Sequence, residues 1–233
     1  IVWTTATESD AVVHVGDAPD ALDLAFEGDA AGIQHEVRVT GLQPNRTYFY
    51  DVGGAAGVLA GGDAEHTFRT APSPGSKTKM RAWVVGDSGT GDADQAAVRD
   101  AMLAHVGPRG QAQLYLHVGD MAYDAGTTDE FSTNFFAVYE TVLRRVPLFT
   151  AIGNHEGSSS DSGTQSGPYY NAYVTPTAGE LGGVPSGTEA YYGFDWGNVH
   201  FIVLDSHDSS RDPDGPMMTW MRDDALATDR DWL

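Results

Sequence analysis

The fold is decided by the stretch Leu114-Tyr-Leu-His-Val-Gly119, which is followed at once by Asp120. A short apolar run of this kind is typical of a buried parallel strand. The pattern occurs twice more, where Met80-Arg-Ala-Trp-Val-Val-Gly86 precedes Asp87 and Pro147-Leu-Phe-Thr-Ala-Ile-Gly153 precedes Asn154. Ligands of open α/β sheets bind at the carboxyl ends of the strands. The sequence therefore predicts that three oxygen-bearing side chains point at one place.

Helical patterns separate these apolar runs and make them parallel neighbours. Residues 92–106 and 130–146 carry apolar side chains at helical spacing, and acidic residues stand in the first turn of the earlier segment. Further along, 190–196 and 199–204 flank Gly197-Asn198 and predict a hairpin, and a last helix is expected over 217–227. Strands that alternate with helices predict an α/β domain built from βαβ units.

The first 70 residues have a different character, since no helical pattern occurs in them. Short β-rich segments alternate there with Gly, Asp and Pro turns, which predicts an all-β sandwich. The expected strands are 1–5, 11–15, 22–26, 34–40, 47–52 and 66–70.

Tyr48 follows a corner turn in this region and resembles the tyrosine corner of β-sandwiches. With 66–72 as a closing strand, the region looks like a fibronectin type III-like module that lacks its first strand. The alternative is that Tyr48 and Tyr50 are ordinary strand aromatics. The Pro/Ser/Gly-rich stretch 73–79 is the expected linker, so we predict a sandwich over 1–72 and a catalytic domain over 80–233.

Charge and composition exclude several classes of function. The 233-residue chain has a formal net charge of −20 and no cysteine. This charge argues against nucleic-acid and membrane partners, and the absence of cysteine removes disulfides and thiolate chemistry. No apolar run is long enough to span a membrane. A phosphorylated substrate would also be repelled unless bound cations reverse the local field.

The predicted cluster of oxygen donors suits a pair of metal ions. Two ions held ~3.5–4 Å apart need one carboxylate that bridges them and further ligands for each ion. Asp120, from the central strand, is expected to bridge; Asp87 and Tyr123 would serve one ion, and Asn154 the other. Hard oxygen donors suit Fe(III), Mn, Mg or Zn, and a tyrosinate prefers a strongly Lewis-acidic cation.

These motifs resemble one branch of the metallophosphoesterase (calcineurin-like) superfamily. Gly-Asp87-Ser-Gly89, Gly-Asp120-Met-Ala-Tyr123 and Gly-Asn154-His-Glu156 are similar to the series found in purple acid phosphatases, which also carry a fibronectin-like domain ahead of the catalytic one. Most of the superfamily has histidine where Gly89 stands.

The resemblance implies a binuclear metal centre of Fe(III) with Fe(II), Zn or Mn. It also implies a secreted acid phosphatase, extracellular or periplasmic, that hydrolyses small phosphomonoesters by metal-hydroxide attack.

His155 is expected to contact the substrate phosphate or its leaving-group oxygen, and to act as the catalytic acid. The alternative is a supporting histidine fixed by a carboxylate such as Glu156, which is itself expected to orient its neighbours. Asp205 and His207 follow a strand end and either border the cleft or only shape a loop. His117 is expected in the core or behind the site.

The family pattern also requires three further histidines, and this chain has no motif that supplies them. The sequence therefore reads as a fragment truncated at both ends. Two other functions stay open: a phosphodiesterase or nucleotide hydrolase on the same scaffold, and a non-catalytic binding or adhesion protein with a degenerate site.

Overall fold

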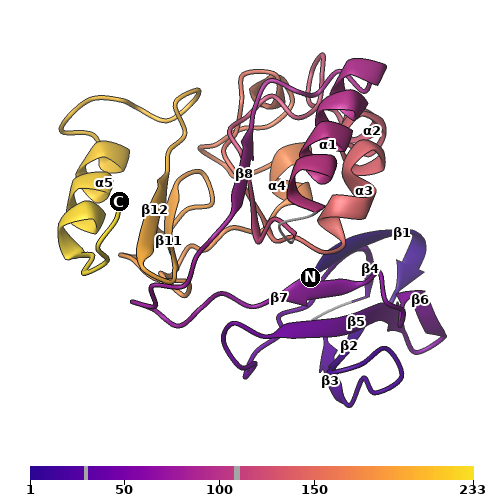
Figure 1. Cartoon of the computed structure of the whole chain (residues 1–233). Helices are drawn as coiled ribbons and strands as arrows, with labels where there is room; N and C mark the ends of the chain where they lie inside the picture. The colour runs from indigo at the N-terminus through magenta and orange to yellow at the C-terminus, as the bar shows by residue number, and fades with distance from the viewer. Residues whose placement is uncertain (29–30, 108–110) are drawn as a thin grey trace. The chain divides into compact units, whose positions relative to one another are not determined.

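The computed structural model describes residues 1–28, 31–107 and 111–233 (Figure 1). The chain forms two compact units. The first comprises Ile1–Ala71 together with Thr141–Pro147, and the second comprises Pro72–Glu140 and Leu148–Leu233. Each unit is described by itself below.

The first unit is strand-rich and antiparallel throughout its described residues. One sheet has the order β3-β2-β5-β6 with β7 also paired to β5, and β1 pairs β4 in a second sheet. The strands are β1 (Val2–Ser9), β2 (Val12–Gly16), β3 (Leu24–Glu27), β4 (Gly32–Glu36), β5 (Thr47–Gly54), β6 (Gly57–Gly61) and β7 (Thr67–Arg69). Each predicted segment overlaps a strand, whereas β6 was not predicted because its sequence, Gly-Val-Leu-Ala-Gly, does not alternate.

Both sheets contribute to one apolar core. Val13 and Val15 of β2 and Val52 of β5 are buried, and Trp3 of β1 packs against the same cluster. Tyr48 is buried in this core, and its hydroxyl oxygen accepts the N–H of Gln43 at 2.9 Å. A tyrosine hydroxyl bonded to backbone a few residues upstream is the bond that defines a tyrosine corner.

The second unit is built on three parallel strands, as predicted. They are β8 (Ala82–Val85), β9 (Leu114–His117) and β10 (Leu148–Thr150), in the order β10-β9-β8. His117 lies opposite both Val85 and Thr150, so the three strands end at the same level. The residues that follow the strands are therefore delivered to one edge of the sheet.

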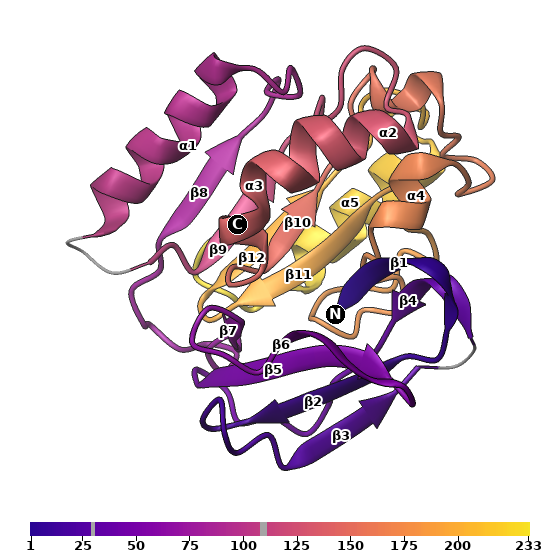
Figure 2. The ribbon, with the colours of Figure 1, turned by 90° about the vertical axis from the view of Figure 1, so that its right-hand side faces the viewer.

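The helices between the strands also match the prediction, with one difference. Helix α1 (Ala93–Val106) is capped by Asp92, whose side chain accepts the N–H groups of Asp94 and Gln95. The second expected helix is one continuous ribbon in Figure 2, but its middle is π-helical. It comprises α2 (Thr128–Glu130), η2 (Phe131–Phe136) and α3 (Ala137–Leu143).

A hairpin and a last helix complete the unit. Strands β11 (Tyr192–Trp196) and β12 (Val199–Val203) pair across Gly197-Asn198, and α5 (Pro216–Ala227) follows; both features were predicted. The buried His200 of β12 ties these elements together, because its ring nitrogens lie 2.8 Å from Asp195 and 2.7 Å from Asp224 of α5. Two short helices, η3 (Glu156–Ser158) and α4 (Pro168–Ala172), lie in the connection before the hairpin.

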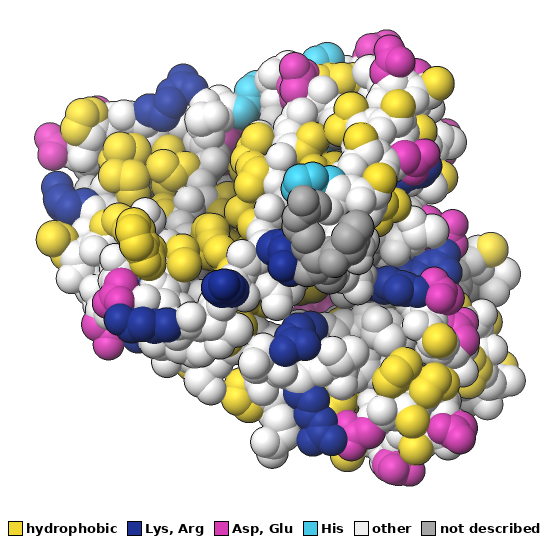
Figure 3. All heavy atoms as spheres, in the orientation of Figure 1, with side chains coloured by type: hydrophobic (Ala, Val, Ile, Leu, Met, Phe, Trp, Pro, Cys, Tyr) yellow, Lys and Arg dark blue, Asp and Glu magenta, His cyan; other side chains and the backbone are white. Residues whose placement is uncertain are grey.

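Hydrophobic side chains gather on the surface over α5 and the β11–β12 hairpin (Figure 3). Leu226 of α5 is exposed, as are Trp232 and Leu233. The α/β unit thus presents an apolar area to solvent. No described helix has the length and the apolar composition that a membrane crossing requires.

Candidate metal centre

Two of the strand-end turns are bonded directly to each other. The N–H of Asp87 donates to the carbonyl of Gly119 at 3.0 Å, and the N–H of Ser88 donates to the carbonyl of Asp120 at 3.0 Å. Both aspartates adopt left-handed backbone conformations, with φ of 58° and 59°. Such conformations are costly for residues other than glycine and cluster at functional sites. The equivalent turns after β8 and β9 are therefore built alike and held side by side.

Asp87 and Tyr123 form the first pair of candidate metal ligands. The Tyr123 hydroxyl donates to Asp87 Oδ1, and the Tyr123 N–H donates to the carbonyl of Gly89 at 2.9 Å. Burial and the neighbouring carboxylate raise the pKa of Tyr123 above its ordinary value. The phenol therefore keeps its proton unless a cation displaces it.

Gly89 explains why a histidine is absent from this turn. A Cβ at this position would lie 2.4 Å from the backbone of Met121 and Ala122. The turn after β8 therefore packs directly on the turn after β9, and no side chain fits between them.

Asp120 and Asn154 form the second pair. The Asn154 side-chain amide donates to Asp120 Oδ2 at 3.3 Å, and its oxygen accepts the N–H of His155 at 3.3 Å. The Asn154 amide and the Asp120 carboxylate are thus direct neighbours, and both line the same cavity. Their oxygen atoms are of the kind that a hard metal ion prefers.

The Glu156 carboxylate holds the strand-end turns of the site together. It is fully buried and accepts four backbone N–H groups, two from the strand-end residues Asp120 and Gly153 and two from Met121 and Ala122, at 2.7–3.0 Å. Burial raises the pKa of Glu156 above its ordinary value, against the opposing effect of these donors. The orienting role predicted for Glu156 thus consists of locking the turns after β9 and β10 together.

His155 lies beside the candidate ligands. Its N–H donates to Asp120 Oδ1 at 3.0 Å, and its ring meets the Tyr123 ring edge-on, with centroids 4.2 Å apart. Ring atom Nδ1 lies 2.6 Å from the carbonyl oxygen of Asp124. The suggestion that Glu156 fixes this ring is wrong, because backbone N–H groups occupy the Glu156 carboxylate.

The open part of the site is a cavity of about 510 Å³. Asp87, Asp120 and Asn154 line it together with Ser206 and His207. His207 therefore borders the cleft, which is one of the two roles considered for it. Its position just after the end of strand β12 indicated this role in the sequence. Asp205 does not line the cavity and is fully buried.

His117 lies behind the site in the core. Burial lowers its pKa to about 3, so the ring is uncharged near neutrality. Its Nε2 lies 2.9 Å from the hydroxyl of Ser88, the residue after Asp87. It thus supports the turn that presents Asp87.

The residues present fit a hard cation through oxygen atoms. Two carboxylates, one phenol and one amide from three strand ends converge, and oxygen ligands of this kind suit Fe(III), Mn, Mg or Zn. Among residues 1–28, 31–107 and 111–233, no cluster of three or more His, Cys, Asp or Glu side chains could hold a metal ion. The ligand assignments of Asp87, Asp120, Tyr123 and Asn154 stay predictions.

Comparison with known proteins places the chain in a family. The profile of the calcineurin-like phosphoesterases matches residues 80–233, and that of the purple acid phosphatase N-terminal domain matches residues 1–70. The chain therefore belongs to the calcineurin-like phosphoesterase family. Within it, the relatives are purple acid phosphatases.

Two relatives from Arabidopsis thaliana illustrate the similarity. Probable inactive purple acid phosphatase 24 is 30% identical over 200 residues, which cover 76% of this chain and 31% of that protein. Purple acid phosphatase 21 is 28% identical over 235 residues, which cover 94% and 48%. The chain thus spans about a third to a half of the length of such relatives.

A solved structure shows the same fold. The purple acid phosphatase isolated from yellow lupin (Lupinus luteus) seeds matches with a TM-score of 0.68 over 98% of this chain and 46% of that one, at 20% sequence identity. The strand-rich domain followed by an α/β metallophosphoesterase domain is therefore confirmed as the fold class. The closer description of the first domain as fibronectin type III-like stays a prediction.

Proposed function

We propose that the protein is a binuclear-metal acid phosphatase that hydrolyses small phosphomonoesters. The observation that carries this proposal is the convergence of Asp87, Asp120 and Asn154, from three strand ends, on one cavity, with Tyr123 bonded to Asp87. The family membership of residues 80–233 supports the same reaction class.

Four residues would hold the metal pair. Asp87 and Tyr123 would bind Fe(III), Asp120 would bridge, and Asn154 would bind the second ion, Fe(II), Zn or Mn. Such a centre, when bound, supplies Lewis acidity and a water-derived nucleophile for attack at phosphorus. It would also reverse the negative field of a chain whose formal net charge is −20, which a phosphate group must otherwise overcome.

His155 would assist departure of the alcohol. Because a carbonyl oxygen only accepts, the contact of Nδ1 with the Asp124 carbonyl places a proton on Nδ1 and leaves Nε2 for the substrate. The backbone N–H of His155 is bonded to Asp120, so the ring keeps a fixed position beside the predicted bridging carboxylate. With a second proton on Nε2, the ring would donate that proton to the leaving-group oxygen and return to its neutral form, protonated on Nδ1.

The experiment is a comparison of metal content and turnover in matched variants. The purified chain would be loaded with Fe and Zn, then assayed by elemental analysis and with p-nitrophenyl phosphate. Asp120→Ala is expected to lose both metals and turnover, whereas Asp129→Ala, at an exposed carboxylate of α2, should keep both. Two metals per chain in Asp120→Ala would contradict the bridging role. A bis(p-nitrophenyl) phosphate arm separates the monoesterase from the phosphodiesterase alternative.

A non-catalytic function is the second candidate. It is favoured by relatives that are named probable inactive purple acid phosphatases. In that case the chain would bind metal and phosphate without turnover. An extracellular or periplasmic location, and the absence of nucleic-acid and membrane partners, are further proposals that rest on the family resemblance and the acidic charge.

A further inference from the structure

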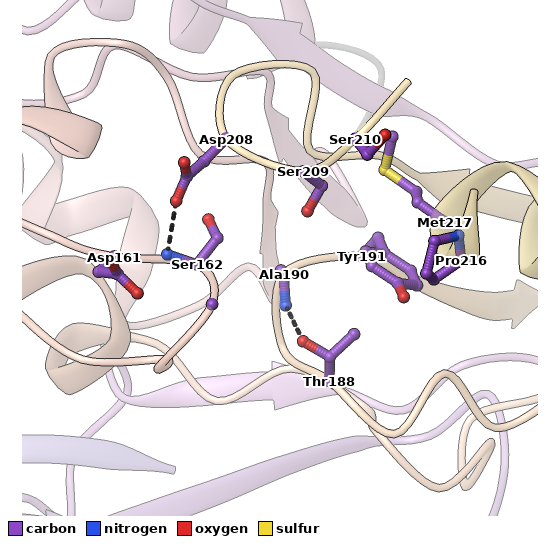
Figure 4. A pocket seen from close by; sticks show the side chains of 11 residues that line it. Asp161, Ser162, Thr188, Ala190, Tyr191, Asp208, Ser209, Ser210, Pro216 and Met217 are labelled. Atoms are coloured by element: carbon purple, nitrogen blue, oxygen red, sulfur yellow. Dashed lines mark hydrogen bonds between the residues drawn. The ribbon is translucent and has the colours of Figure 1, made fainter. Parts of the chain in front are cut away.

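A second cavity in the α/β unit is lined by the turn that also borders the metal site. Its volume is about 380 Å³, within the usual range for small-molecule pockets. Ser206 and His207 line the first cavity, and the next residues, Asp208, Ser209 and Ser210, line the second. Figure 4 shows the residues that border this open cavity, which come from this turn, from segments 161–163 and 188–191, and from the start of α5.

The shared turn is held rigidly by Asp205. This buried carboxylate accepts the N–H groups of His207, Asp208 and Ser209 at 2.9 Å and the Ser209 hydroxyl at 2.8 Å. Burial alone would raise the pKa of Asp205, but these donors together hold it below its ordinary value. The carboxylate therefore stays charged and fixes the turn that lines both cavities.

The opposite wall is tied to the same turn. The N–H of Ser162 donates to Asp208 Oδ2 at 2.9 Å, as Figure 4 shows, and the hydroxyl of Tyr170 donates to Ser162 Oγ at 2.8 Å. Ser162 and Tyr170 are both buried. The cavity is thus preformed by hydrogen bonds, one of which links residues 46 apart in sequence.

The lining has two chemical sides. One carries carboxylates and hydroxyls, from Asp161, Asp208, Ser162 and Ser209, and the pKa of Asp161 is held below its ordinary value by its bonds to Thr164. The other side presents Tyr191, Pro216 and Met217. The ring centroids of Tyr191 and Trp220 are 5.2 Å apart. Among the described residues no Lys or Arg lines the cavity.

We propose that this cavity is a subsite for an uncharged, polyhydroxylated group, such as a sugar or a linear polyol. Carboxylates accept strong hydrogen bonds from vicinal hydroxyls. The Ser162 hydroxyl accepts from Tyr170 and therefore still has a proton to donate, whereas the Ser209 hydroxyl donates to Asp205 and can only accept. The Tyr191 ring offers apolar surface for the C–H groups of such a molecule. The two carboxylates repel anions, so a second phosphate is excluded. An ammonium ion would use the carboxylates but not the donor capacity of the Ser162 hydroxyl.

The subsite also deepens the proposed function, on which this part rests. Because the two cavities share the turn 206–210, a phosphate bound beside His207 would place its alcohol near Asp208. The leaving group favoured by this geometry is then the polyhydroxylated alcohol of a sugar or polyol monophosphate.

Binding of the free polyol tests the subsite without metal or catalysis. The ¹⁵N-labelled chain would be titrated with D-sorbitol, with tetramethylammonium chloride and with inorganic phosphate. Saturable shifts of the Ser162, Tyr191 and Ser209 amides by sorbitol are expected, with no saturable shift by the other two probes. No saturable response to sorbitol, or a stronger response to tetramethylammonium, would overturn the proposal.

Two variants localise the effect. Asp208→Asn keeps an acceptor for the Ser162 N–H but removes the charge, and it is expected to weaken sorbitol binding by about five-fold. Asp229→Asn, at a carboxylate that is 85% exposed, should bind as the parent does. Equal weakening in both variants would contradict the assignment.

A chain that binds sorbitol but hydrolyses no phosphomonoester would keep the subsite and refute only the catalytic proposal. A chain that hydrolyses p-nitrophenyl phosphate but does not bind sorbitol would support the catalytic proposal and refute the subsite.

Discussion

The turns after β8 and β9 and the turn after β12 all place an aspartate at a strand end, but they use it in opposite ways. Asp87 and Asp120 line an open cavity, and Asp87 is exposed. Asp205 is fully buried and accepts four hydrogen bonds from the turn that it begins. The same residue type is thus a candidate ligand in two turns and a structural brace in the third.

The difference arises from the residues around each aspartate. A glycine precedes Asp87 and Asp120, and both aspartates adopt left-handed conformations, whereas Leu204 precedes Asp205. In the first two turns the N–H groups of Asp87 and Ser88 are bonded to carbonyls and that of Asp120 to Glu156, so neither aspartate carboxylate is used to satisfy the backbone of its own turn. After β12, Asp205 itself accepts the N–H groups of its turn.

The largest loss of stability is expected from Glu156→Ala. Four backbone N–H groups would lose their acceptor in a buried place, which should lower the free energy of unfolding by about 4 kcal/mol. Urea denaturation measures this. Glu156→Gln retains one accepting oxygen and should lose less stability. Equal losses in the two variants would refute the role of Glu156 as the acceptor that joins the turns.

Asp205→Ala comes next. It removes the acceptor of three N–H groups and one hydroxyl in a buried turn, and should cost about 3 kcal/mol. Metal content should stay unchanged, because Asp205 does not line the metal cavity. Loss of metal with little loss of stability would indicate that Asp205 is a metal ligand. The three aspartates would then have the same role.

Gly89→Ala tests the direct packing of the first two turns. The new methyl group would lie 2.4 Å from the backbone of the turn after β9, so that turn must shift at a cost of about 2 kcal/mol. The control is Gly62→Ala, at a glycine where a Cβ meets nothing within 4 Å but where φ is 71°. A Gly89→Ala variant no less stable than this control would show that the turns are not in contact.

The smallest change in stability is expected from Asp87→Asn. The side chain is exposed, so the free energy of unfolding should change by no more than about 0.5 kcal/mol. Fe(III) affinity, measured by competition with a chelator of known affinity, should nevertheless fall by at least about ten-fold, because an amide is a much weaker ligand than a carboxylate. Unchanged Fe(III) affinity would remove Asp87 from the ligand set.

The sequence predicted the parts of the fold and site that depend on local pattern. The parallel order of β8, β9 and β10 and the convergence of their polar successors follow from apolar runs, intervening helices and strand-end glycines. Strand β6 was missed because two glycines frame an unalternating run, and the π-helical turn of 131–136 has no periodicity that separates it from an α-helix.

The remaining features depend on contacts between distant segments. Glu156 could be suspected of orienting its neighbours, but which four N–H groups it accepts is decided only when two strand ends meet. The contact of the Asn154 amide with Asp120, and the burial of Asp205, likewise cannot be predicted from neighbouring residues in the sequence.

The central claim is that the oxygen atoms at three strand ends bind metal together. The most direct test is calorimetric titration of Zn²⁺ into the purified chain and into Asp120→Asn, with elemental analysis of both. The account predicts that the parent chain binds metal and that Asp120→Asn loses all of it, since Asp120 is the residue that we propose both ions share. Retention of the full metal content by Asp120→Asn would contradict it.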